Sequence, residues 1–179
     1  MNRTTWIAWV LAVIAVGATG CDTGGTGAGT SAPKSVAPRP QGTGPLPEKV
    51  VRADLDTTAA EAGVPNNAPD YARSAENRTD GSLASCTVAF KGYGTKAEPA
   101  DPARFDRVVS GLHERDWRES RQREEDTRGG SVAEARVVLE QRGWTLIASY
   151  QDVLNGVITL QAAEDSCVEG VDGDVGLFG

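Results

Sequence analysis

The chain has 179 residues, of which 24% are charged and 39% hydrophobic, and its formal net charge is -7. That length accommodates one ordinary domain with a small appendage, which excludes a large multidomain enzyme. The acidic balance argues against nucleic acid as a partner, and a single His with three Cys leaves too few ligands for a Cys/His zinc cluster.

Residues 1–20 have the layout of an export signal. Arg3 gives a positive start, an apolar run extends from Trp6 to Val16, and small residues continue to Gly20. The eleven apolar residues would span about 16 Å as a helix, roughly half of a ~30 Å hydrocarbon core. We therefore expect a signal peptide rather than a permanent membrane helix.

The segment that follows this run, Ala18-Thr19-Gly20-Cys21, resembles a bacterial lipobox, although Ala18 stands where Leu is more usual. The resemblance implies cleavage before Cys21 and attachment of diacylglycerol to its sulfur, which would anchor the chain in the lipid bilayer. A general secretory signal with an incidental cysteine and an uncleaved anchor are the alternatives.

A Gly-, Pro- and Thr-rich stretch separates Cys21 from the rest of the chain. Asp22–Pro47 contains too few large apolar residues to build a core. We therefore divide the chain into a signal peptide (1–20), a lipidated N-terminus with a disordered linker (21–47) and one domain (48–179). As a flexible coil, the linker would reach about 25 to 30 Å from the lipid surface.

Two helices are expected in the domain. The first follows Pro47, has apolar residues at helical spacing within Val51–Ala62, and ends at Gly63 and Pro65. After a predicted loop over residues 64–81 and a strand, the second begins at Asp101-Pro102, a cap followed by a first-turn proline, and extends to about Arg115.

Alternation of apolar and polar residues, together with turn signals, predicts strands over Ser85–Tyr93, Trp117–Glu125, Ser131–Gln141, Trp144–Gln151 and Val157–Ala162. Trp117–Glu125 is expected at an edge because it is densely charged. Ser131–Gln141 also fits a helix, since Ser131 and Glu134 match a capping box. We favour a hairpin through Arg142-Gly143 and expect another through Asn155-Gly156. The order of elements predicts an α+β fold: one antiparallel meander with two helices packed on one face, preceded by the linker.

Several segments together resemble the small secreted lipoproteins of high-GC Gram-positive (actinobacterial) bacteria. These are the lipobox with its linker, the helix–strand–helix unit around Cys86, the segment Arg142–Leu146 and the closing Glu164–Cys167. The resemblance implies a location and a fold, and it implies no activity.

Cys86 and Cys167 remain once Cys21 is assigned to lipid. An even pair in an exported domain predicts a disulfide, here closing a loop of 81 residues. A redox-active pair is the alternative, but the chain has no Cys-x-x-Cys spacing that would tune a thiol.

Other polar residues carry weaker signals. His113 lies at the edge of a helix stripe without a nucleophile, and the arginines from Arg115 to Arg128 alternate with acids, which predicts a solvated mixed-charge edge. The acidic stretch from Glu164 to Asp174 lacks the spacing of an EF-hand, so weak binding of divalent cations and a flexible end both stay open. Apolar faces such as that of Val51–Ala62 contain no intruding acid, Lys or His, so we expect no catalytic residue. We also assign no cofactor and no dedicated metal site.

Four aromatic residues are candidates for a carbohydrate- or peptide-binding face: Tyr93, Trp117, Trp144 and Tyr150. Their alternative role is in the core. We expect a non-catalytic binding module, lipid-anchored on the extracytoplasmic face of the cell membrane, whose partner is an envelope protein or a wall ligand. A small envelope hydrolase using a carboxylate pair is the alternative function.

Overall fold

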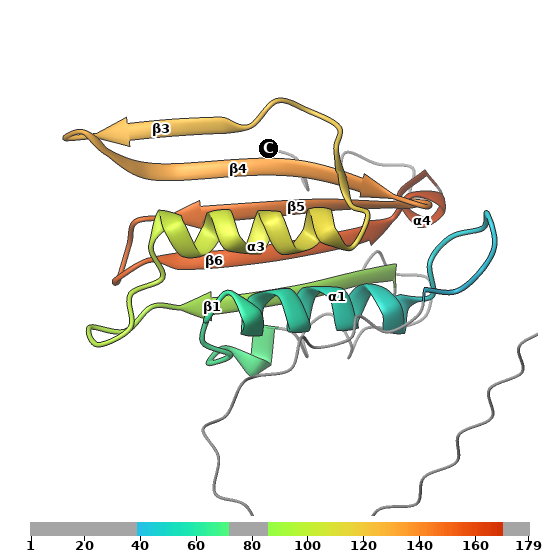
Figure 1. Ribbon diagram of the computed structural model, residues 1–179, viewed down its shortest axis with the longest axis horizontal. Helices are drawn as coiled ribbons and strands as arrows, with labels where there is room; N and C mark the ends of the chain where they lie inside the picture. The colour runs from blue at the N-terminus through green and yellow to red at the C-terminus, as the bar shows by residue number, and fades with distance from the viewer. Residues whose placement is uncertain (1–38, 72–85, 170–179) are drawn as a thin grey trace, which may run out of the picture. The chain divides into compact units, whose positions relative to one another are not determined.

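The computed structural model of the chain describes residues 39–71 and 86–169. Within them, six strands form one antiparallel sheet, and helices α1 and α3 lie over the same face of it (Figure 1). The predicted α+β class and the single antiparallel sheet are confirmed. No helix in this part of the chain is long and apolar enough to cross a membrane.

The elements in chain order are α1 (Glu48–Glu61), β1 (Thr87–Tyr93), α3 (Pro102–Glu114), β2 (Arg118–Glu119), β3 (Glu124–Arg128), β4 (Ser131–Gln141), β5 (Trp144–Gln151), β6 (Val157–Glu164) and α4 (Asp165–Glu169). The strand order is β1-β6-β5-β4, with β2 and β3 pairing with opposite ends of β4. Three successive hairpins therefore connect β3 to β6, and β1 pairs with β6 to form the far edge of the sheet.

The two helices begin and end close to their predicted positions. The Asp101 side chain accepts a hydrogen bond from the Arg104 backbone N–H at 2.8 Å, and Pro102 occupies the first turn of α3. The apolar stripe of α3 is buried, and its members are Phe105, Val108, Val109 and Leu112. Helix α3 packs on α1, β4 and β5, while α1 also packs on β1.

The alternative of a helix over Ser131–Gln141 is excluded by a continuous ladder between β4 and β5, in register from Glu134 opposite Gln151 to Gln141 opposite Trp144. The connecting residues Arg142 and Gly143 have φ angles of 42° and 76°. Two consecutive positive φ angles are what a two-residue type I′ hairpin requires.

The sheet has a helix-covered face and a second face, which we call the outer face. Buried side chains of β5 alternate with half-buried or exposed ones, so Trp144, Leu146, Ala148 and Tyr150 belong to the core. Between them lie the outer-face side chains Thr145, Ile147, Ser149 and Gln151. The same alternation in the neighbouring strands places the core between the sheet and the two helices.

The prediction of a single edge strand over Trp117–Glu125 is wrong, because the structure has two short strands there, β2 and β3. Trp117 precedes β2 and is fully buried, and the chain leaves the sheet again before β3. The Arg123 guanidinium lies 5.2 Å from the centre of the Phe105 ring and 2.7 Å from Asp106. These contacts draw the connection toward α3 and divide the edge into two short strands.

The folded part also begins earlier than Glu48. Leu46 is 2% exposed, and its backbone N–H donates to the carbonyl of Arg142. The Arg142 guanidinium in turn donates to the carbonyls of Pro40 and Gly44. Residues 39–47 are therefore a strap on the β4–β5 hairpin and not part of the linker. At the other end, the acidic stretch starts at Glu164, the last residue of β6, and continues as a short helix, α4. The rest of the expected flexible end, from residue 170, lies outside the described residues.

Candidate functional site

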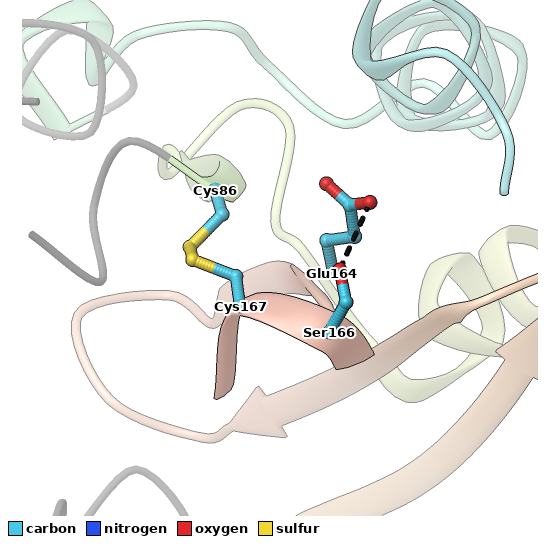
Figure 2. The surroundings of a disulfide bond; sticks show 4 residues. All are labelled: Cys86, Glu164, Ser166 and Cys167. Atoms are coloured by element: carbon cyan, nitrogen blue, oxygen red, sulfur yellow. Dashed lines mark hydrogen bonds between the residues drawn. A yellow bond between two sulfur atoms is a disulfide. The ribbon is translucent and has the colours of Figure 1, made fainter. Parts of the chain in front are cut away.

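Cys86 and Cys167 form a disulfide, as predicted. Cys86 lies immediately before β1 and Cys167 lies in α4, with their Cα atoms 6.2 Å apart across 81 positions (Figure 2). The register of β1 against β6 places Thr87 opposite Ala163, which brings both cysteines to one end of the sheet. The bond therefore fastens α4 to the start of β1. The third cysteine, Cys21, lies outside the described residues.

The predicted aromatic binding face does not exist as expected. Trp117, Trp144 and Tyr150 are 0%, 1% and 3% exposed and belong to the core. Trp144 and Tyr150 lie at alternating positions of β5 on the helix-covered face. Trp144 is enclosed there, whereas Tyr150 also lines a hollow at the end of the sheet. Tyr93 alone of the four lies on the outer face, half-buried, with the Lys91 ammonium 5.4 Å from the centre of its ring.

Both buried indoles have hydrogen-bond partners, which explains how they are accommodated in the core. The Trp144 N–H donates to the carbonyl of Leu46 at 2.8 Å, and the Trp117 N–H donates to the Asp54 carboxylate at 3.0 Å. The strap therefore serves as a partner for one indole, and α1 supplies the partner for the other.

Asp54 corrects the expectation that no acid interrupts the apolar face of the first helix. Its side chain is buried, and the carboxylate accepts from Trp117 and, at 3.1 Å, from the Arg39 guanidinium of the strap. Arg39 also donates to Gln141 at 3.2 Å. A buried carboxylate with two such donors is a structural group, because every contact is to a side chain that packs the domain. Its position, three residues after Val51 and four before Thr58, places it on the buried stripe of α1, so helical spacing does carry a signal for this acid.

His113 occupies a half-buried position at the end of α3, as expected. Its Nδ1 lies 3.0 Å from the Trp117 carbonyl and its Nε2 lies 3.2 Å from the Glu119 carboxylate. Both ring nitrogens are thus engaged with groups that fix the turn after α3, and neither lies beside a Ser or Cys nucleophile in these contacts. The ring has a structural place there.

Arg115, Arg118, Arg123 and Arg128 are paired with acids, as the mixed-charge interpretation predicts, but Arg115 is buried, so the expected solvated position is wrong for this residue. Their ion pairs are Arg115–Glu61 at 2.7 Å, Arg118–Asp116 at 3.5 Å, Arg123–Asp106 at 2.7 Å and Arg128–Asp126 at 3.4 Å. Among the described residues, no group of three or more His, Cys, Asp or Glu side chains is placed to hold a metal ion. Asp172 and Asp174 of the acidic stretch lie outside the described part.

The outer face contains two broad hollows of about 630 and 520 Å³. Both contain Glu124 and Arg136, so opposite charges lie next to each other along the floor. Over β1 and β6, the face is partly covered by Tyr71, whose hydroxyl accepts from Gln161 and whose ring lies 5.0 Å from the Lys91 ammonium. The hollows therefore offer positive, negative and uncharged polar groups together, and this mixture does not favour one class of ligand.

A smaller hollow of about 430 Å³ lies where the β5–β6 turn meets the start of α3. Tyr150, Asp101 and Asp152 line it. Burial raises the pKa of the Tyr150 hydroxyl, and the negative charges of Asp152 and Asp101 raise it further. This end of the domain therefore combines a buried phenol, an acidic rim and the exposed β5–β6 turn.

Comparisons with protein-family models, with curated proteins and with solved structures find no match to this chain.

Proposed function

We propose that the protein is an exported lipoprotein, anchored through Cys21 in the cell membrane, whose folded domain is a non-catalytic binding module on the extracytoplasmic side. The pairing of Cys86 with Cys167 carries this proposal. Structural disulfides persist in oxidising compartments and are rare in the cytosol. The pair also leaves one cysteine of the three, and that cysteine follows directly on the export-like segment.

The contacts of Asp54 and His113 support binding rather than catalysis. Asp54 contacts Arg39 and Trp117, and His113 contacts Trp117 and Glu119. These titratable groups bond to side chains and backbone that hold the fold, whereas an acid–base catalyst must present its proton to a substrate. The domain instead offers surface hollows at its outer face and at the β5–β6 turn, where a partner can dock.

Replacement of Cys21 by Ser tests the anchor. We expect the Cys21→Ser chain to move from the membrane pellet to the soluble fraction of the envelope, because a serine hydroxyl is not the acceptor for the thioether-linked lipid. Fractionation of a lipoprotein-processing bacterial host, followed by immunoblotting, measures the shift. The Thr23→Ser chain is the matched control and should stay in the pellet. A Cys21→Ser chain that stays in the pellet and keeps residues 1–20 contradicts the proposal.

A further inference from the structure

Val153 and Leu154, in the β5–β6 turn, expose 50% and 76% of their surface, and they are the large hydrophobic residues that are exposed within the described part of the chain. A single exposed apolar side chain is ordinary on a protein surface. Two in succession at the tip of a turn, beside a hollow, place an apolar anchor where a partner can reach it.

The backbone holds this tip in one conformation. Leu154 and Asn155 have φ angles of 51° and 70°, a region that non-glycine residues seldom adopt. The Gly156 N–H donates to the Val153 carbonyl at 2.8 Å, and the Ala100 N–H donates to the Asn155 carbonyl at 3.0 Å. Backbone bonds thus hold Leu154 in a conformation that its own side chain disfavours.

The backbone segments at the base of the turn approach each other so closely that only glycine fits. A Cβ atom added at Gly156 would lie 1.8 Å from the Ala100 carbonyl oxygen, and one added at Gly94 would lie 2.0 Å from the Asn155 carbonyl oxygen. These contacts hold the tip in place through the rest of the domain, which lowers the conformational cost of binding a partner.

The hollow beside the tip has apolar walls and an acidic rim. Pro99, Pro102 and Val132 are among the residues that line its walls. Its charged lining residues are Asp101 and Asp152. A volume of about 430 Å³ falls within the range of ligand pockets. The site therefore complements a group that is apolar along its length and cationic at its end, as Lys and Arg side chains are.

We propose that Val153, Leu154 and the adjoining hollow form a docking site for a protein segment in which Lys or Arg neighbours a large apolar residue. The apolar residue packs on the Leu154 tip, and the alkyl stem of the cation lies along the proline-lined wall with its charge at Asp101 and Asp152. This site deepens the binding role proposed above and rests on it. The acidic rim disfavours an anionic lipid surface as the occupant.

Selection from a random dodecapeptide library displayed on phage, with the full chain as the immobilised target, tests the site. We expect enriched peptides to contain Lys or Arg next to Leu, Ile, Phe or Met. A synthetic copy of the most enriched peptide should bind at least about tenfold more weakly to Leu154→Asn and to Asp152→Asn chains. Asn tolerates positive φ and Asp152→Asn keeps the side-chain shape, so both variants should retain the fold.

The control is Glu114→Gln, an exposed acid at the end of α3, which should bind the peptide as the unaltered chain does. Enriched peptides without a basic residue, or equal affinity for all of these chains, would overturn the site. So would retention of the chain by phosphatidylglycerol vesicles that is lost in the Leu154→Asn chain, because the tip would then bind lipid. None of these results changes the Cys21→Ser fractionation, so failure of the site is distinguishable from failure of the anchor.

Discussion

Replacing both Cys86 and Cys167 by Ser should lower the free energy of unfolding of the oxidised protein by about 4.5 kcal/mol. The bond closes a loop of 81 residues, and the chain-entropy account gives about that value for the freedom that the unfolded chain regains. This loss is a large fraction of the total free energy of unfolding, which is commonly only about 5–15 kcal/mol for a domain. Urea unfolding at equilibrium, with both chains carrying Cys21→Ser to remove the third thiol, measures the difference.

A reductant separates the crosslink from the substitutions themselves. Reduction should destabilise the chain that keeps Cys86 and Cys167 by a similar amount and leave the double variant unchanged. A reductant-insensitive unfolding midpoint in the former chain, together with two free thiols in protein purified from the envelope, would show that the pair is not oxidised. The cysteine pair would then no longer indicate an oxidising compartment.

Replacing Trp117 by Ala should lower the free energy of unfolding by roughly 3–5 kcal/mol, the usual cost of removing a buried large aromatic side chain. Trp117 is fully buried, and its N–H donates to the buried Asp54 carboxylate at 3.0 Å. Trp117→Phe keeps most of the ring volume but removes that donor, so it should cost about 1–3 kcal/mol. Thermal and urea unfolding of the full chain measure both effects.

Tyr93→Phe is the matched control, because Tyr93 was expected on the same binding face but lies half-buried on the outer face. Loss of its hydroxyl should change stability by less than about 0.5 kcal/mol. If Trp117→Ala leaves the unfolding midpoint unchanged, Trp117 is a surface residue and the assignment of the core is wrong.

The sheet was largely predictable from local sequence. Alternation along β5 and the two-residue turn at Arg142-Gly143 fix which residues of β4 and β5 pair, because the side-chain period of a strand is two and the turn sets the register. Asn155-Gly156 marks the next hairpin, but Gln151 pairs with Val157 across residues 152–156, so this signal predicts the hairpin and not its register. The same local signals located α3, through its cap at Asp101. These features depend on neighbours within a few positions, which is why the sequence alone indicates them.

The aromatic positions could not be assigned in this way. Alternation shows that Trp144 and Tyr150 share a face of β5, but only the long-range packing of α1 and α3 decides that this face is the buried one. The Trp117 indole donates a hydrogen bond to Asp54, 63 positions away in the sequence. The Trp144 indole donates to the carbonyl of Leu46, 98 positions away. Partners this distant leave no periodic trace in the sequence, so the strap and the burial of Trp117 went unpredicted. Asp54, by contrast, lies at the spacing of the buried helix stripe, three positions after Val51.

The mass of the N-terminal peptide of the protein, purified from membranes of a lipoprotein-processing host, distinguishes a chain anchored through Cys21 from a secreted or uncleaved one. We predict that the mature chain begins at Cys21, with residues 1–20 removed and diacylglycerol attached to the Cys21 sulfur. The same preparation should show the Cys86–Cys167 bond in non-reduced peptides. A chain that begins at any other residue, or an unmodified Cys21 thiol on an intact signal segment, would contradict the account.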